Sequence, residues 1–274
     1  MSADPTAMQR QSSLFAATKE SVVTYEQPLN ERIRALLRLE YLFDGVEHRI
    51  NGADEWDSRA ALTGLIEVTD LLSRFDLKAE LNKELERHAG ILQGLQQNPG
   101  VDPARLQDIL EQINELLVTM RSNGCQPAQM LRKDELIYAI KQRLPIPGGT
   151  CNFDLPAYHY WLTRPVAVRV EQLHYWFNDL RIIKDAVELV LHLIRDSAHP
   201  QTVTAVAGFY QQPVDPNTVC QLVRVVVPGS LQAFPEISGG RHRFTIRFLE
   251  QPSSASRPAQ TDMDIPFELQ CCNL

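Results

Sequence analysis

Cys151 and His159 are the residues of this chain whose types and spacing first suggest chemistry. The cysteine follows Gly148-Gly149-Thr150, and the histidine lies eight residues further on. A thiol nucleophile needs a base within hydrogen-bond reach and a third group that orients the base. The pair would suit a thiol hydrolase, and a turn after two prolines explains the glycines equally well. A hydrolase that uses Cys151 and His159 therefore stays an alternative, which replacement of Cys151 by Ser would test.

Other enzyme signatures are missing from the sequence. It contains no G-x-x-x-x-G-K-[ST] phosphate loop, no G-x-G-x-x-G and no H-E-x-x-H. His88 and His192 fall within apolar helical patterns and are expected to be packing residues, not metal ligands. The five cysteines form no Cys-x-x-Cys pair, which favours reduced thiols over a disulfide framework or a zinc site. We therefore predict a protein that is not an enzyme, with no catalytic residues, no metal and no cofactor.

A second group of residues is basic. Arg243 and Arg247 alternate with apolar residues, so a strand would place both on its outer face. Arg34 and Arg38 lie four apart and share one face of a helix, while His159 lies in an aromatic segment. Arginine forks pair with carboxylates, so such a surface would suit a carboxylate-bearing partner and would be weakened by salt. Neighbouring basic residues of the same kind are Arg164, Arg241 and His242.

The elements that position these residues change type along the chain. Residues 1–20 lack periodic hydrophobicity and are predicted to be a flexible tail, and 22–26 is a short β-rich run. From Asn30, a capping residue, apolar positions recur with helical spacing. A second helix is expected from about Asp57 to 75. Asp102-Pro103 is a helix start, so the helices at about 81–95 and 103–120 should form an antiparallel hairpin. Further helices are expected at about 128–143, 155–162, 166–178 and 180–197.

After residue 199 the apolar period changes to two. Strands are predicted at Val203–Tyr210, Val219–Val227, His242–Leu249 and Ile265–Cys272. The fold class is therefore α+β: a mainly α-helical bundle domain at 21–199 joined to a small, mainly antiparallel β-sheet domain at 200–274. The run at 22–26 is expected as a possible strand of the β-domain. Tyr158, Trp161 and Trp176 belong to an aromatic concentration that is expected to be mostly core, with one or two rings left to line a peptide groove.

Bulk composition narrows the class of partner. The chain has 274 residues, 44% hydrophobic, with a net charge of −7. This acidic balance counts against nucleic acid as a partner, although aromatic rings beside arginines keep a single-stranded nucleic-acid binder as an alternative. No apolar run approaches the ~20 residues of a membrane span, and no secretory signal opens the chain. We therefore expect a cytoplasmic protein without membrane insertion.

Several segments, in order along the chain, resemble the ZapD family of bacterial division proteins. They are YEQPLNERIR at 25–34, LRLEYL at 37–42, QRLPIPGG at 142–149, FDLP at 153–156, GFYQ at 208–211, PEISG at 235–239, RFTIRF at 243–248, FEL at 267–269 and CC at 271–272.

This resemblance covers roughly residues 22–272 and implies a function. It implies a helical domain with a β-domain, a homodimer, and binding to the C-terminal tail of FtsZ, so that the dimer cross-links filaments at the midcell division ring. The family's binding surface is expected to be basic, and the matching positions are Arg34, Arg38, His159, Arg243 and Arg247. The resemblance does not extend to residues 1–20.

Overall fold

The structure is a computed structural model that describes residues 21–74, 76–96, 98, 100–214, 220–240 and 243–273. The tail predicted at residues 1–20 lies outside the described residues. The described chain divides into two compact units: a helical unit, residues 30–197, and a β unit made of residues 21–29 and 198–273. Helices together with antiparallel sheets confirm the α+β class. That each unit folds as an independent domain stays a prediction.

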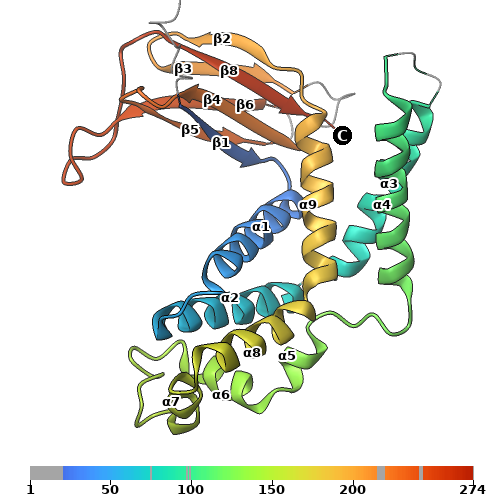
Figure 1. Cartoon of the computed structure of the whole chain (residues 1–274). Coiled ribbons are helices and arrows are strands. Elements are labelled where there is room, and N and C mark those ends of the chain that lie inside the picture. Colours follow the sequence, from blue (N-terminus) through green and yellow to red (C-terminus); the bar gives the residue numbers. More distant parts are fainter. Residues whose placement is uncertain are drawn as a thin grey trace, which may run out of the picture. The chain divides into compact units, whose positions relative to one another are not determined.

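The helical unit contains all the described helices (Figure 1). They are α1 (Glu31–Arg49), α2 (Glu55–Arg74), α3 (Leu77–Gly94), α4 (Pro103–Arg121), α5 (Gln129–Lys133), α6 (Glu135–Arg143), α7 (Pro156–Leu162), α8 (Val166–Asn178) and α9 (Arg181–Asp196). Within the described part of the chain, none of these helices has the length and apolar character needed to cross a membrane.

Two helix starts follow the capping signals in the sequence. The Asn30 side chain accepts a hydrogen bond from the Ile33 backbone N–H at 2.9 Å, and Asp102 accepts one from the Ala104 N–H at 2.9 Å. Both bonds satisfy N–H groups that have no partner inside the helix. Pro103 then occupies the first turn of α4, where its missing N–H costs nothing. Both predicted starts are confirmed.

Helices α3 and α4 form the predicted antiparallel hairpin, which packs against α9 (Figure 1). Their apolar stripes meet there: Leu81 and Leu85 of α3 and Ile113 of α4 are at most 1% exposed. Helix α9 supplies an extended buried face, which includes Val187 and Val190. The long amphipathic helices are therefore fixed by burial of one face of each.

The helix expected at about 128–143 is two helices, so that prediction was wrong at its centre. Asp134 leaves the helical conformation and caps α6 by accepting from the Leu136 and Ile137 N–H groups at 2.9 and 3.1 Å. Its other carboxylate oxygen accepts from Trp176 Nε1 at 3.2 Å. An aspartate inside a helical pattern thus serves as a new N-cap, since its side chain competes for backbone N–H groups.

The β unit contains two four-stranded antiparallel sheets in its described part. One has the order β1-β4-β8-β2, and the other has β3-β6-β5 with β7 paired to β6. The strands are β1 (Val22–Pro28), β2 (Gln201–Ala205), β3 (Phe209–Pro213), β4 (Leu222–Pro228), β5 (Phe234–Gly239), β6 (Arg243–Glu250), β7 (Ala259–Gln260) and β8 (Ile265–Cys272). Strand β1 lies at an edge and pairs with β4, with Tyr25 opposite Val225.

Side chains from both sheets form one apolar core. Phe248 of β6 lies against Phe267 of β8 with ring centroids 5.3 Å apart, and Tyr210 of β3 meets Phe267 edge-on at 5.5 Å. Phe244 and Ile246 of β6 are also at most 1% exposed. Because side chains alternate along β6, its other face remains free to carry polar groups.

The strand predicted at Val203–Tyr210 is two strands in different sheets, so its continuity was wrong. Ala207 and Gly208 adopt left-handed backbone conformations, with φ of 47° and 70°. A side chain on Gly208 would also lie 2.6 Å from the Thr261 carbonyl oxygen, so only glycine fits this turn. The alternating apolar residues before it concealed the break.

Candidate partner-binding site

The exposed side of β6 carries Arg243 and Arg247, as the alternation in the sequence predicts. Both arginines are exposed, while Phe244, Ile246 and Phe248 between and beside them are buried. Within the described residues, neither guanidinium forms a hydrogen bond or an ion pair. Both are therefore available to a carboxylate from outside the unit.

Flanking strands complete this surface, which we call the β6 face: Arg243, Thr245 and Arg247 with their outward neighbours on β3 and β5. Arg247 lies between Phe209 of β3 and Glu236 of β5 in the strand register. Phe209 is 37% exposed and adds an apolar contact beside the charge. Glu236 offsets part of the charge of Arg247. The β6 face can therefore take an extended segment that offers both a carboxylate and an apolar side chain.

Arg34 and Arg38 lie on α1 in the helical unit, with different surroundings. Arg34 pairs with Glu31 one turn earlier. Arg38 is exposed and lines a groove of about 500 Å³ between α1 and α2, together with Tyr41 and Arg74. Arg38 is the freer of the two, because Glu31 already neutralises much of the charge of Arg34.

A basic groove next to this one was not foreseen. Arg74 lines both grooves, and the second, of about 860 Å³, also carries Lys78, Arg132 and Lys133. Asp76 also lines this groove, and its carboxylate accepts a hydrogen bond from the Ala79 N–H as the N-cap of α3. Four cations from α2, α3 and α5 thus surround one open groove. In the sequence, this groove is indicated only by the spacing of Arg74 and Lys78 and by the adjacent basic pair at 132–133.

His159 lies apart from these arginines on α7. It is exposed and lines a shallow pocket with Phe153 and Tyr160, which are 81% and 63% exposed. The Arg164 guanidinium lies 5.6 Å from the Tyr160 ring centroid. Tyr158, Trp161 and Trp176, by contrast, are at most 9% exposed and belong to the core.

The predicted site residues therefore belong to different units. Arg34, Arg38 and His159 are in the helical unit, and Arg243 and Arg247 are in the β unit. Within the helical unit, Arg34 and Arg38 share a helix, whereas His159 lines a separate pocket. Arg241 and His242 lie outside the described residues. The role of these side chains in binding stays a prediction.

Potential catalytic and metal-ligating groups are dispersed in the described residues. The Cys151 thiol donates to Asp154 Oδ2 at 3.3 Å, while His159 faces the shallow pocket. No three His, Cys, Asp or Glu side chains gather as a metal site in the described part of the chain. His88 is a packing residue with no exposed surface, but His192 is 55% exposed and lies 3.4 Å from Asp196, so its predicted packing role was wrong.

Comparisons with known proteins agree with the resemblance seen in the motifs. The family model of ZapD, described as a cell division protein, matches residues 37–247. The cell division protein ZapD of Methylococcus capsulatus is 42% identical over 252 residues, covering 92% of this chain and 98% of that protein. Those of Chromobacterium violaceum and Azoarcus sp. are each 39% identical, covering 92% of this chain and 99% and 100% of the relatives. The chain therefore belongs to the ZapD family of cell division proteins.

Proposed function

We propose that this protein is a non-enzymatic division factor that binds the C-terminal tail of FtsZ. As a homodimer in the cytoplasm it would cross-link FtsZ filaments and so stabilise the midcell ring during septum formation. Neither nucleic acid nor membrane insertion has a part in this mechanism. Membership of the ZapD family supports the role in division, and the surface chemistry supports the mode of binding.

The observation that carries the proposal is the β6 face. Arg243 and Arg247 are exposed and unpaired within the described residues, on a strand whose opposite face is fixed in the core. Such rigid support keeps the two guanidinium groups at a constant spacing, which lowers the entropy lost on binding. A tail segment with carboxylates would pair with them, and Phe209 would contact an apolar side chain of the segment.

The basic groove of the helical unit provides a second surface for an anionic segment. Arg74, Lys78, Arg132 and Lys133 concentrate positive charge there in a protein whose net charge is −7. A local field of this kind attracts an acidic partner even when the whole protein is acidic. We assign this groove an auxiliary role in the capture of FtsZ.

Two copies of the tail-binding surface in one dimer would account for bundling. After one FtsZ tail is bound, the second site meets neighbouring tails at high effective concentration. Filament bundling therefore requires both tail binding and dimerisation. Light scattering after size-exclusion chromatography should give twice the chain mass of 31.1 kDa.

Co-sedimentation with polymerised FtsZ tests the proposal. The wild-type protein should increase the FtsZ that pellets at low speed, and FtsZ that lacks its C-terminal tail should show no increase. Equal pelleting of the two FtsZ forms would refute tail binding.

Charge-reversal variants then locate the surface. The double variant Arg243→Glu, Arg247→Glu should abolish the increase, and Arg74→Glu with Arg132→Glu should reduce it. Arg257→Glu is the matched control, because Arg257 is an exposed arginine of the β unit that follows β6 in sequence and does not belong to the β6 face. Normal bundling by the β6 double variant would refute the β6 face, and circular dichroism would verify that it is folded.

The alternative functions predict different results. A thiol hydrolase would lose activity on an ester or peptide when Cys151 is replaced by Ser, whereas the adaptor should co-sediment unchanged. A single-stranded nucleic-acid binder would shift an oligonucleotide in a gel at moderate salt, and we expect no shift.

A further inference from the structure

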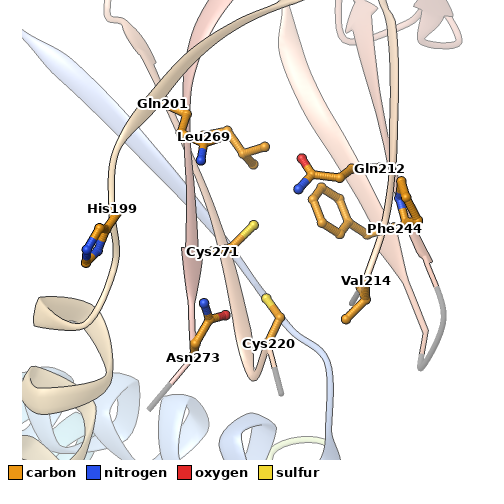
Figure 2. A pocket seen from close by; sticks show the side chains of 10 residues that line it. His199, Gln201, Gln212, Val214, Cys220, Phe244, Leu269, Cys271 and Asn273 are labelled. Carbon is orange, nitrogen blue, oxygen red and sulfur yellow. The ribbon is translucent and has the colours of Figure 1, made fainter. Parts of the chain in front are cut away.

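Two thiols in the β unit share one cavity, which the adaptor function does not use. The cavity has a volume of about 210 Å³, and Cys220 and Cys271 form part of its wall (Figure 2). Both cysteines are half-buried. His199, Gln201 and Asn273 also line it and are exposed, so a small solute can reach the thiols from solvent.

The strand pairing brings the two cysteines together. Cys271 lies on β8 opposite Val223 of β4, and Cys220 lies two residues before β4 begins at Leu222. The Cys220 side chain points toward Cys271 (Figure 2). Its sulfur lies 3.6 Å from the Leu222 carbonyl oxygen. Cys272 is fully buried on the opposite face of β8.

The two thiols differ in acidity because of their contact. The neighbouring Cys220 thiol lowers the pKa of Cys271, because a thiol at that position can donate to the Cys271 thiolate and stabilise it. Interaction with Cys271, together with burial, raises the pKa of Cys220. Since the thiolate is the nucleophile, Cys271 is the more reactive member of the pair.

We propose that Cys220 and Cys271 form a redox-active pair that hydrogen peroxide converts to a disulfide. The Cys271 thiolate attacks one peroxide oxygen, so that an S–O bond forms, the O–O bond breaks and hydroxide leaves. Cys220 then loses its proton and attacks the Cys271 sulfenic acid, so that the S–S bond forms and the S–O bond breaks. In sum, two thiols and one peroxide give one disulfide and two waters.

The second step becomes easier once the first has occurred. The Cys271 sulfenic acid is uncharged, so the negative charge that holds the proton on Cys220 is gone. The product joins Cys220, which lies two residues before β4, to Cys271 of β8, and β4 and β8 are neighbours in one sheet. This inference is independent of FtsZ binding, because neither cysteine belongs to the β6 face.

Peptide mapping of the full-length protein tests the pair directly. After treatment with hydrogen peroxide and alkylation of the remaining thiols, tryptic peptides 196–224 and 248–274 should appear as one disulfide-linked species that reductant separates. The link should persist in Cys272→Ala and disappear in Cys271→Ala. In Cys220→Ala, a dimedone label should mark a trapped sulfenic acid on Cys271.

Cys151 provides the matched control thiol. It is half-buried like the pair, but its hydrogen-bond partner is a carboxylate, Asp154, at 3.3 Å. It should remain reduced at the peroxide concentration that links the two peptides. The proposal is overturned if the wild-type protein gives no linked peptides, if the link survives in Cys271→Ala, or if Cys151 is oxidised at the same rate.

Discussion

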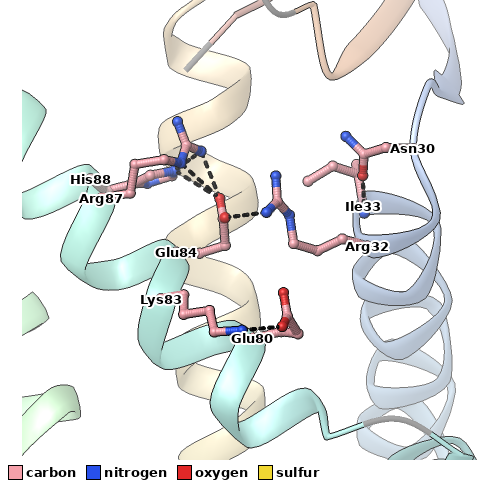
Figure 3. Close-up of polar contacts among 8 residues, drawn as sticks. All are labelled: Asn30, Arg32, Ile33, Glu80, Lys83, Glu84, Arg87 and His88. Atoms are coloured by element: carbon pink, nitrogen blue, oxygen red, sulfur yellow. Dashed lines mark hydrogen bonds and ion pairs between the residues drawn. The ribbon is translucent and has the colours of Figure 1, made fainter. Parts of the chain in front are cut away.

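Replacing Glu84 by glutamine should destabilise the helical unit more than any other isosteric change on α3. Glu84 is 2% exposed, and its carboxylate pairs with Arg32 of α1 at 2.5 Å and with Arg87 at 2.6 Å (Figure 3). It therefore links α3 to α1 through one buried charge. Glutamine keeps the shape and one acceptor oxygen but leaves two guanidinium groups without their anion.

The size of the effect follows from burial. Breaking a buried pair by removal of one charge typically costs about 3–5 kcal/mol. The two arginine side chains are 33% and 35% exposed, so water compensates part of the lost contact. We expect Glu84→Gln to lower the free energy of unfolding by about 2–3 kcal/mol. Glu80→Gln is the matched control, because its pair with Lys83 is on the surface of the same helix (Figure 3).

Tryptophan fluorescence in urea measures this change selectively, since Trp56, Trp161 and Trp176 all lie in the helical unit. With an m-value of about 2–3 kcal/mol/M, the midpoint for Glu84→Gln should fall by about 1 M. Glu80→Gln should unfold at the wild-type midpoint. Equal midpoints for the two variants would show that the Glu84 carboxylate does not hold α1 and α3 together, and the reasoning would fail.

Three further changes test other parts of the helical unit. Burial, then the charges of neighbouring Arg87 and Arg32, lower the pKa of His88 to about 4. The unfolded chain therefore binds a proton that the folded chain excludes. As the pH falls from about 6.5 to about 4, the free energy of unfolding of the wild type, measured by urea titration, should fall by on the order of 3 kcal/mol relative to that of His88→Gln. Parallel pH profiles of the two proteins would contradict this. Arg169 is 4% exposed and donates to the Ser58 hydroxyl at 2.6 Å and to backbone carbonyls. Arg169→Met should therefore lower the free energy of unfolding by about 2–4 kcal/mol in the same fluorescence assay. An unchanged midpoint would refute this structural role of Arg169. Asp102→Ala should lower the free energy of unfolding by about 1 kcal/mol, because α4 loses its N-cap. Asp102→Asn should retain most of the stability that the cap provides.

Local signals predicted much of the fold because their physics is local. The Asn30 and Asp102 caps need only nearby backbone N–H groups, so sequence alone located both helix starts. The helix at Val166–Asn178 and the strand at Ile265–Cys272 also have the predicted bounds. In each case the periodic apolar face is long enough to decide between helix and strand.

Features that depend on distant partners escaped prediction. The break at Asp134 is stabilised by Trp176, 42 residues further on. The turn at Gly208 is enforced by Thr261 from another part of the β unit. Strand β5, Phe234–Gly239, contains a proline and a glycine that reduce its strand signal, and it forms because β6 pairs with it. A single sequence does not reveal such contacts.

The candidate site likewise contains one feature that local sequence predicted and one that depends on residues far apart in the chain. Alternation along one strand predicted that Arg243 and Arg247 would share an exposed face, because a strand's own geometry decides it. The basic groove needed Arg74 and Arg132, which are far apart in sequence, to meet through helix packing.

Charge in the helical unit is unevenly distributed, which explains how an acidic protein presents a basic groove. On α1, burial and three neighbouring carboxylates, Glu40, Glu188 and Glu47, raise the pKa of Asp44. Acidic side chains of α1 and α9 therefore lie close together, with Lys184 paired to Glu47 and Glu188, while α2, α3 and α5 surround the basic groove. A partner responds to the local field of the surface it approaches, since charges beyond about 10 Å are largely screened at 0.1 M salt. The net charge of −7 thus reports the excess of one surface over another, and it does not argue against an acidic partner at the basic groove or the β6 face.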